Sequence, residues 1–247
     1  MEKTALKKLI SYAVVFSLIP LVCAMLINSF LIPSLKKSSK AQIEKKSPTV
    51  INLPINKSNY IKDGEDYRVG SDSAKIIVQM FSDYGCIHCK NATDAILEAQ
   101  KTFGMDKVLF VYRFFPISNS CNPNIQHPGF FESTCLLSIA TRCAGQQKHF
   151  FEFRKWASNG ITMSESEKKK NLTKEGILHF ARKLGLDIEA FKDCLKSKDE
   201  LSKIQSDANR AQELNIEGTP MIIINGHIYE GSNSTIAFLD YFKSLQN

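Results

Sequence analysis

Hydrophobic and polar residues divide the chain into successive stretches of different character. Residues 9–33 are almost wholly apolar, residues 34–65 are rich in Lys, Ser, Asn and Pro, and residues 66–247 carry strand-like and helix-like patterns. A short basic segment, residues 1–8, precedes the apolar stretch. The pattern predicts a membrane helix, a linker and a folded domain, in that order.

The stretch 9–33 predicts one N-terminal transmembrane helix. Its 25 residues would extend about 37 Å as a helix, which exceeds the roughly 30 Å core of a bilayer. No A-x-A pattern follows it and no lipobox precedes Cys23, which favours an uncleaved anchor over a cleaved signal peptide. Lysines flank both ends and give little orientation. Cysteines further along suit an oxidising compartment, so we expect residues 1–8 in the cytoplasm and the domain outside it.

The folded domain is predicted to open with a strand, a helix and a second strand. Lys75–Phe81 is continuous and β-branched, as a buried strand should be. Asn91–Phe103 has apolar residues at helical spacing and is followed by Gly104, a typical helix end. Val108–Phe115 is a second apolar strand, stopped by Pro116.

Helical patterns then fill the region from about residue 118 to 214. The expected helices are Glu132–Ala144, Gln147–Ala157, Thr173–Leu184, Asp187–Leu195 and Lys198–Leu214. Strand patterns return at Met221–Ile224 and Ile228–Tyr229 around an Asn-Gly turn, and a helix over Ser234–Leu245 closes the chain. The order predicts one α/β framework split by a helical insertion.

Charge and cysteine content narrow the classes of function. Lysines and arginines number 32 against 25 acidic residues, a net charge of +7. Much of the excess lies in the linker and in Lys168–Lys170, which we place in a polar loop. These lysines are not interleaved with aromatic residues, and no nucleic-acid motif is present, so we expect solvated surface and no nucleic-acid partner.

Cys86 and Cys89 mark the junction between the first strand and its helix. A CxxC pair alone is weak evidence, because 7 cysteines in 247 residues produce one by chance in roughly a fifth of such sequences. A cysteine at a helix N-terminus, however, faces unpaired N–H groups and the positive end of the helix dipole, which stabilise a thiolate. Cys86 would be the exposed nucleophile and Cys89 the shielded resolving thiol, with His88 adding a positive charge or a hydrogen bond.

Zinc is the competing use of such a pair. A structural zinc site needs four ligands, usually two CxxC pairs or one pair with two histidines. No second CxxC is present, and the other histidines are scattered: His127, His149, His179 and His227. The sequence therefore favours a redox pair and predicts no metal and no cofactor.

Thr219–Pro220 lies directly before the strand Met221–Ile224. A proline at the start of a central strand removes a hydrogen-bond donor from the sheet. A cis peptide bond here would turn the chain and leave the preceding backbone free to pair with an extended peptide. The segment alone also fits a trans proline that merely ends the preceding helix.

Taken together, Phe81–Cys89, the helical insertion and Gly218–Pro220 before an apolar strand resemble the DsbA-like thiol-disulfide oxidoreductases. The resemblance covers about Tyr67–Asn247, and Arg142–Phe153 is similar to insertion helices of membrane-linked members. It implies a thioredoxin-like α/β fold with an inserted helical domain. It also implies that Cys86 attacks, that Cys89 resolves, and that a cis Pro220 faces them while Thr219 presents its backbone to the substrate.

The sequence departs from the family pattern at Ile87 and Gln79. Many members have proline at the first of these positions and an acidic residue at the second, seven positions before the first cysteine. A buried carboxylate can exchange protons with the resolving thiol, so Gln79 leaves open how Cys89 is deprotonated. Because His88 is retained, we expect Cys86 to have a depressed pKa and the couple to be more oxidising than that of thioredoxin.

The remaining cysteines of the domain allow three sets of pairings. Cys143 and Cys194 fall on helices that should pack together in the insertion, whereas Cys121 and Cys135 flank a short loop. We favour structural disulfides Cys143–Cys194 and Cys121–Cys135.

These features lead us to expect a membrane-anchored enzyme that passes the Cys86–Cys89 disulfide to folding proteins outside the cytoplasm. Its partners would be reduced or misoxidised extracytoplasmic proteins and a membrane thiol oxidase that regenerates the disulfide. Two alternatives stay open: a reductase or isomerase in the same location, and a peptide-binding chaperone whose thiols are incidental.

Overall fold

The fold is given by a computed structural model that describes residues 67–126, 128 and 133–246. The expected anchor (9–33) and linker (34–65) lie outside these described residues. Within them, no helix combines the length and the apolar character needed to cross a membrane.

A five-stranded sheet forms the centre of the domain, with the strand order β1-β3-β2-β4-β5. Strands β2 and β3 run parallel, and the other neighbouring strands pair antiparallel. Every residue of β2 and β3 is buried, as their continuous apolar sequences predict. The strands are β1 Tyr67–Val69, β2 Ile76–Ser82, β3 Val108–Phe114, β4 Met221–Ile224 and β5 His227–Ile228.

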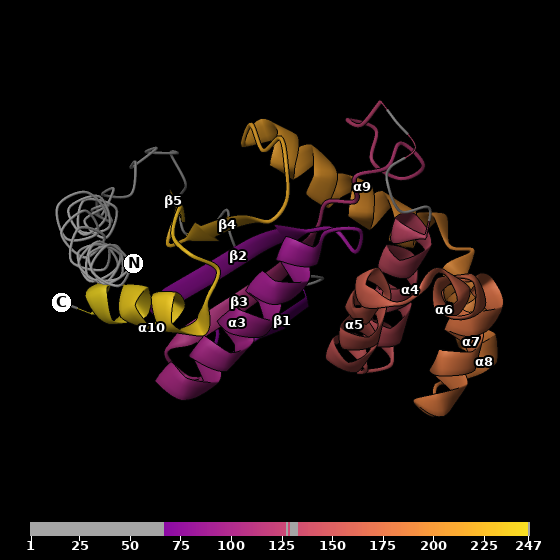
Figure 1. The fold of residues 1–247 in the computed structure, drawn as a ribbon, viewed down its shortest axis with the longest axis horizontal. Helices are drawn as coiled ribbons and strands as arrows, with labels where there is room; N and C mark the ends of the chain where they lie inside the picture. The colour runs from indigo at the N-terminus through magenta and orange to yellow at the C-terminus, as the bar shows by residue number, and fades with distance from the viewer. Residues whose placement is uncertain (1–66, 127, 129–132, 247) are drawn as a thin grey trace, which may run out of the picture. The chain divides into compact units, whose positions relative to one another are not determined.

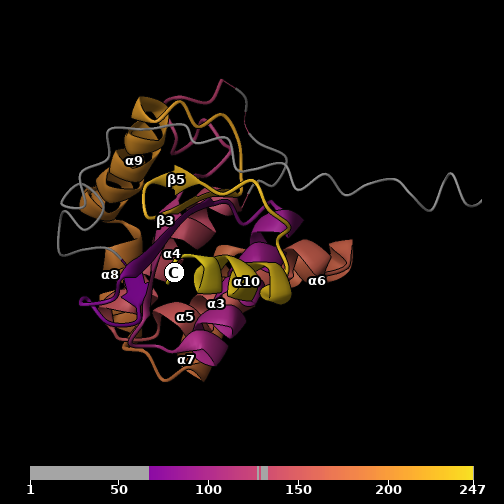
Figure 2. The same ribbon diagram turned by 90° about the vertical axis from the view of Figure 1, so that its left-hand side faces the viewer.

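Helices cover both faces of this sheet (Figures 1 and 2). Helices α3 (Ile87–Phe103) and α10 (Thr235–Ser244) pack side by side on one face, over Val78 and Met80. Helix α9 (Lys198–Glu213) covers the other face. Because side chains alternate along a strand, each face of β2 serves a different core.

Between β3 and β4 the chain forms the insertion. Its helices are α4 Thr134–Gln146, α5 Phe150–Asn159, α6 Glu165–Asn171, α7 Lys174–Lys183, α8 Ile188–Leu195 and α9, with a 3-10 turn, η3, at Gly160–Thr162. This confirms the predicted α/β framework interrupted by helices. In Figure 1, α4 to α8 lie to one side of the sheet, and α9 leads the chain back to it.

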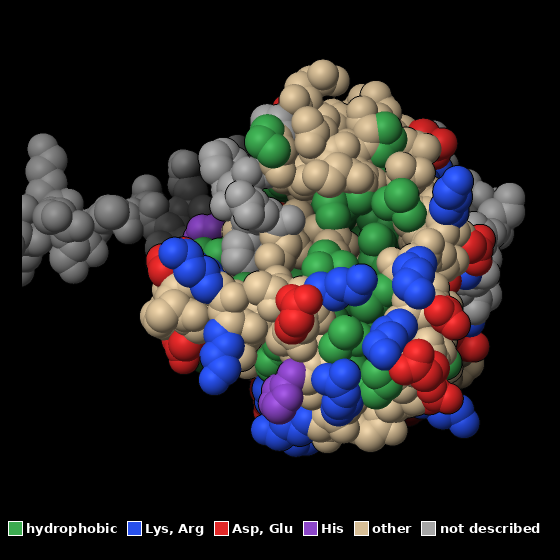
Figure 3. Space-filling model, turned by 90° about the vertical axis from the view of Figure 1, so that its right-hand side faces the viewer, with side chains coloured by type: hydrophobic (Ala, Val, Ile, Leu, Met, Phe, Trp, Pro, Cys, Tyr) green, Lys and Arg blue, Asp and Glu red, His purple; other side chains and the backbone are tan. Residues whose placement is uncertain are grey.

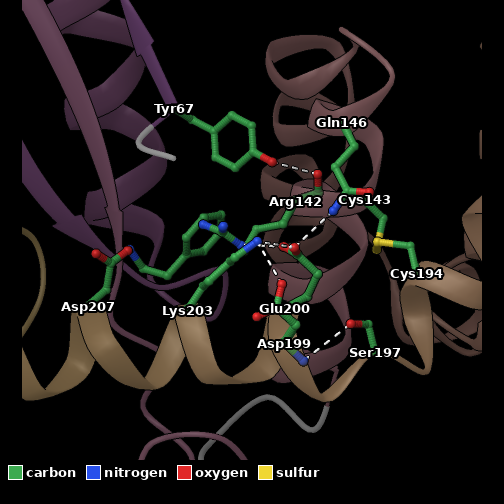
Figure 4. A network of polar contacts seen from close by, with 11 residues as sticks. Tyr67, Arg142, Cys143, Gln146, Cys194, Ser197, Asp199, Glu200, Lys203 and Asp207 are labelled. Atoms are coloured by element: carbon green, nitrogen blue, oxygen red, sulfur yellow. Dashed lines mark hydrogen bonds and ion pairs between the residues drawn. A yellow bond between two sulfur atoms is a disulfide. The ribbon is translucent and has the colours of Figure 1, made fainter. Parts of the chain in front are cut away.

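A buried ion pair ties the insertion together (Figure 4). Arg142 Nε on α4 lies 2.6 Å from Glu200 Oε2 on α9, and both side chains are buried. Lys203 and Gln146 each bind the Glu200 carboxylate at 2.9 Å. The Tyr67 hydroxyl donates to the Arg142 carbonyl at 2.7 Å, which joins β1 to the same network. We call these five residues the α4–α9 clamp.

Two disulfides reinforce the insertion. Cys143–Cys194 links α4 to α8, and Cys121–Cys135 links the segment after β3 to the first turn of α4. These are the two pairings that the sequence favoured. Both disulfides have one cysteine on α4, the first helix of the insertion, and join that helix to another segment.

Three elements differ from the prediction. Lys168–Lys170 lie in helix α6, not in a polar loop, because Ser164 and Glu167 form a capping box at its start. Strand β1 was missed because a three-residue edge strand carries too little pattern to detect. Helix α3 begins at Ile87, four residues earlier than predicted from its apolar spacing.

The outer face of the insertion is mixed in character. Figure 3 views the molecule from the side on which α6, α7 and α8 lie. Hydrophobic side chains gather near the centre of this face, and Lys, Arg, Asp and Glu side chains surround them.

Candidate active site

Cys86 caps the N-terminus of helix α3. Its backbone is extended, with φ −113° and ψ 110°, and its Sγ accepts a hydrogen bond from the Cys89 N–H at 3.3 Å. The helix therefore starts with the sulfur in the position that a serine or aspartate oxygen takes in an ordinary N-cap. Since α3 begins at Ile87, the unpaired N–H groups of its first turn surround Cys86.

The two sulfurs differ in exposure. Cys86 is partly exposed, whereas Cys89, within the first turn of α3, is 1% exposed. Neither cysteine takes part in a disulfide in this structure. A substrate can therefore reach Cys86 directly, while Cys89 is shielded by the domain.

The environment stabilises a thiolate at Cys86. Hydrogen bonding from the Cys89 thiol lowers the pKa of Cys86 to about 6, against the opposing effect of partial burial. The N–H groups of Cys89 and His88 and the side chain of Thr219 contribute in the same direction. Burial, followed by the neighbouring Cys86, raises the pKa of Cys89 well above that of an ordinary thiol. The pair thus combines a reactive thiolate with a protonated partner.

Thr219 and Pro220 face this pair across the site. Met221 of β4 pairs with Phe81 of β2, so the residues before β4 lie beside the end of β2. The Cys86 thiol donates to the Thr219 carbonyl at 3.4 Å, and the Thr219–Pro220 peptide bond is cis. The Thr219 hydroxyl is buried and lies near enough to Cys86 to lower its pKa, but it forms no hydrogen bond of standard geometry with another described residue.

The His88 side chain has a smaller part in this geometry than the sequence indicated. It is exposed, and no hydrogen bond or ion pair joins it to another described residue. Its backbone N–H, in contrast, lowers the pKa of Cys86. Ile87, the other residue between the cysteines, is 36% exposed and lies on the surface beside the reactive sulfur.

The structure corrects the interpretation of Gln79. This side chain lies on the α9 side of the sheet, where its Oε1 accepts from Arg113 Nε at 3.4 Å. The next residue, Met80, lies on the α3 side, and the Thr93 hydroxyl contacts its sulfur at 3.8 Å. A carboxylate at position 79 would therefore not lie beneath Cys89, because the sheet separates them.

Asp83 is the acidic residue that the sequence analysis missed. It follows β2, is 7% exposed, and hydrogen bonds to the hydroxyl of Thr134 on α4. Burial raises the pKa of its carboxyl to about 6. A carboxylate three residues before a CxxC pair was visible in the sequence, but nothing there indicated that it would be buried.

No cluster of three or more His, Cys, Asp or Glu residues suited to a metal ion occurs in the described part of the chain.

Comparison with known proteins agrees with this geometry. A family model described as thioredoxin matches residues 62–243. The chain belongs to the thioredoxin family. Its fold is similar to the crystal structure of Wolbachia pipientis alpha-DsbA1, with a TM-score of 0.59 and 20% identity, over 74% of this chain and 92% of that one. The thioredoxin family membership and the fold shared with alpha-DsbA1 agree with the predicted resemblance to DsbA-like proteins.

Two curated relatives differ in how much of their length is matched. The chain is 28% identical to Na(+)/H(+) antiporter NhaA 1 of Mycobacterium sp. (strain KMS) over 67% of its own length, but spans only 24% of that protein. It is 24% identical to the probable disulfide bond formation protein D of Bacillus anthracis, over 65% of this chain and 70% of the relative. The chain thus spans about a quarter of the length of the antiporter relatives that it matches.

Proposed function

We propose that this chain is a thiol-disulfide oxidoreductase that introduces disulfides into proteins outside the cytoplasm. The carrying observation is the asymmetry of its cysteines: a partly exposed Cys86 with a pKa near 6 beside a buried, protonated Cys89. Such a pair stabilises the reduced form of the protein, which makes its disulfide an oxidant. The likeness to a disulfide bond formation protein supports the same activity.

The reaction proceeds through a mixed disulfide. A substrate thiolate attacks Cys86 Sγ, the Cys86–Cys89 bond breaks, and Cys89 leaves with the electron pair and takes up a proton. A second substrate thiolate then attacks the substrate sulfur of the mixed disulfide, and Cys86 leaves as the stabilised thiolate. The substrate dithiol is oxidised to a disulfide, the protein disulfide is reduced to a dithiol, and one proton is released to solvent for each Cys86 left ionised.

The substrate would lie along the extended backbone at Thr219, directly before β4. A backbone carbonyl beside the reactive sulfur can pair with an extended peptide, which orients the substrate cysteine without selecting its neighbours. Exposed Ile87 supplies an apolar contact next to the sulfur. We therefore propose unfolded or partly folded protein chains as substrates.

Location and regeneration complete the proposal. The apolar stretch 9–33 would anchor the enzyme in the membrane and hold its domain on the extracytoplasmic side. Two disulfides within the domain suit that oxidising compartment. A membrane thiol oxidase, of the quinone-linked kind, would restore the Cys86–Cys89 disulfide after each turnover.

The redox potential of the Cys86–Cys89 pair, combined with peptide oxidation, tests the function. A nucleophile pKa about one unit below that of thioredoxin corresponds to roughly 30 mV, so we expect a potential near −240 mV, against about −270 mV for thioredoxin. The oxidised protein should convert a reduced two-cysteine peptide to its disulfide, and Cys86→Ser should abolish this. A potential at or below that of thioredoxin would indicate a reductase. Peptide binding that survives Cys86→Ser without any oxidation in the unmodified protein would indicate a chaperone.

A further inference from the structure

Asp83 contacts both cysteines through its main chain. Its carbonyl accepts a hydrogen bond from the Cys86 N–H at 3.2 Å. Its main chain also acts to lower the pKa of Cys89, although burial outweighs this effect. A displacement of Asp83 would therefore move the surroundings of both sulfurs at once.

The Asp83 side chain is fixed by donors from separate segments of the chain. The Thr134 hydroxyl, on the first residue of α4, donates to its Oδ1. The backbone of Gly85 and of Ile117, in the segment after β3, also stabilises the carboxylate. No Lys or Arg forms an ion pair with Asp83 within the described residues. A buried carboxylate held by neutral donors keeps its negative charge unbalanced.

We propose that Asp83 is a positioning residue that ties the active-site loop to helix α4 and, when ionised, opposes the thiolate of Cys86. The proposal rests on the redox function proposed above and adds a residue that limits the oxidising strength of the couple. Its basis is geometric: one buried residue binds Cys86 through its backbone and the insertion through its side chain.

Electrostatics sets the direction of the effect. The charge of Cys86 helps raise the pKa of Asp83, after the larger effect of burial, so each negative charge disfavours the other. In the disulfide form the Cys86 charge is absent, and Asp83 ionises without that opposition. The Asp83 charge therefore destabilises the reduced protein relative to the oxidised one, which makes the disulfide a weaker oxidant.

The other titratable groups near Asp83 do not change charge near neutral pH. Tyr84 and Tyr112 are buried beside it, and burial raises the pKa of both. Cys89 stays protonated for the same reason. Arg154 on α5 is buried and pairs with Asp94 on α3 at 3.0 Å. Between about pH 5 and 8, Asp83 and Cys86 are thus the groups that change charge together.

The test replaces Asp83 by a neutral residue of the same shape. In Asp83→Asn we expect the Cys86 pKa, followed by thiolate absorbance, to fall by about one unit. The equilibrium constant for exchange with glutathione should shift about tenfold toward the reduced protein at pH 7.5. The shift should shrink toward pH 5, where Asp83 is protonated in the unmodified protein. An unchanged Cys86 pKa, or an equal shift at every pH, would overturn the proposal.

Two further variants make the result specific. Thr134→Val keeps the Asp83 carboxyl but removes its hydrogen-bond donor, so the Asp83 pKa should rise. The glutathione equilibrium should then shift toward the reduced protein only between about pH 6 and 7, where Asp83 is newly protonated. It also keeps the question answerable if Asp83→Asn does not fold. Asp240→Asn makes the same charge change on exposed α10 and should leave the Cys86 pKa unchanged; an equal shift there would contradict the proposal. None of these readouts uses substrate oxidation, so failure of the proposed function would leave them interpretable.

Discussion

At the scale of single residues, the reactive sulfur depends on atoms within one turn of helix and one facing strand. The Cys89 thiol, main-chain N–H groups and Thr219 lower the Cys86 pKa, whereas the His88 imidazole points to solvent. Backbone donors are supplied by the fold itself. The side chain of His88, between the cysteines, is thus freer to vary than the helix start that both cysteines share.

Thr219 offers a direct test of this account. Thr219→Val removes a hydroxyl near Cys86 while keeping the side-chain shape and the carbonyl that accepts from the thiol. We expect the Cys86 pKa to rise by about half a unit to one unit and the disulfide to become a weaker oxidant. Thiolate absorbance against pH gives the pKa, and Thr219→Ser, which retains the hydroxyl, should stay near the original value. A Val variant with an unshifted pKa would show that the hydroxyl has no influence.

The ionisation of Cys86 also predicts a pH dependence of stability in the reduced protein. Its pKa is about 6 in the fold against an ordinary value of 9.0. Because the pKa is lower in the folded protein, ionisation of Cys86 stabilises the fold. This stabilisation is complete above pH 9 and is lost as the pH falls to about 6. The difference between the two pKa values corresponds to about 4 kcal/mol in the free energy of unfolding. Because the sulfur is half-exposed, solvent screening reduces this contribution to about 2 kcal/mol.

Urea unfolding of both redox forms measures this effect. Between pH 6 and 8.5 the reduced protein should gain stability relative to the oxidised protein, which has no thiolate. Asp83 acts at lower pH: its raised pKa removes stability as pH rises from about 4 to 6. Parallel pH profiles for the two redox forms would contradict the assignment of the thiolate to the folded state.

Residue roles could be predicted where a local pattern determines them. Cys86 and Cys89 were found from their spacing at a strand-to-helix junction, and Thr219 from the proline after it. Gln79 was misplaced because both faces of β2 are buried, so no alternation of apolar and polar residues shows which face a side chain occupies. Asp83 was missed because its burial depends on α4, which lies about 50 residues further along the chain.

At the scale of secondary-structure elements, α4 connects the insertion to the rest of the domain. It carries one residue of each disulfide, the Arg142 end of the α4–α9 clamp and the Thr134 hydroxyl on Asp83. Its first turn approaches the active-site loop and its last turns approach α8 and α9. Changes in the packing of α4 therefore reach the cysteines through Asp83.

The α4–α9 clamp should contribute to stability well above the level of a surface ion pair. Glu200→Gln removes the carboxylate that contacts Arg142 Nε, and breaking a buried pair from one side costs about 3 kcal/mol. Glu213→Gln breaks an exposed pair with Arg210 on the same helix and should cost less than about 0.5 kcal/mol. Urea denaturation compares the two variants; equal losses would show that burial gives the clamp no special role.

Elements were predictable where a capping residue precedes an apolar helical pattern. Helices α7 to α10 were placed within one residue at each end, whereas α3, the longest helix of the described residues, starts four residues earlier than predicted. Helix α6 was missed because none of its residues is buried, so no apolar period marks it, although its capping box was present in the sequence. The first turn of α3 lacks a regular spacing of apolar residues because it contains active-site residues.

At the scale of the whole molecule, the membrane attachment remains a prediction from residues 9–33. We expect the full chain to fractionate with membranes from cells that express it. A chain lacking residues 1–33 should become soluble while keeping the Cys86 pKa and the glutathione equilibrium of the full chain, because the described domain supplies every group of the site. Membrane binding by the truncated chain would place the attachment elsewhere.

The burial of Cys89 has a consequence for finding the proteins that this enzyme serves. A partner captured on Cys86 is released by a second thiol of its own or by the neighbouring resolving thiol, which is shielded from outside molecules. Cys89→Ala removes that internal escape route without opening the surface. When Cys86 of this variant is first converted to a mixed disulfide with glutathione, a client thiolate displaces the glutathione thiolate and stays bound to Cys86. Clients should then accumulate as covalent adducts that survive denaturing gels and are released by reduction, whereas Cys86→Ala should retain none. The same shielding that protects the dithiol thus turns a single substitution into a means of cataloguing its clients.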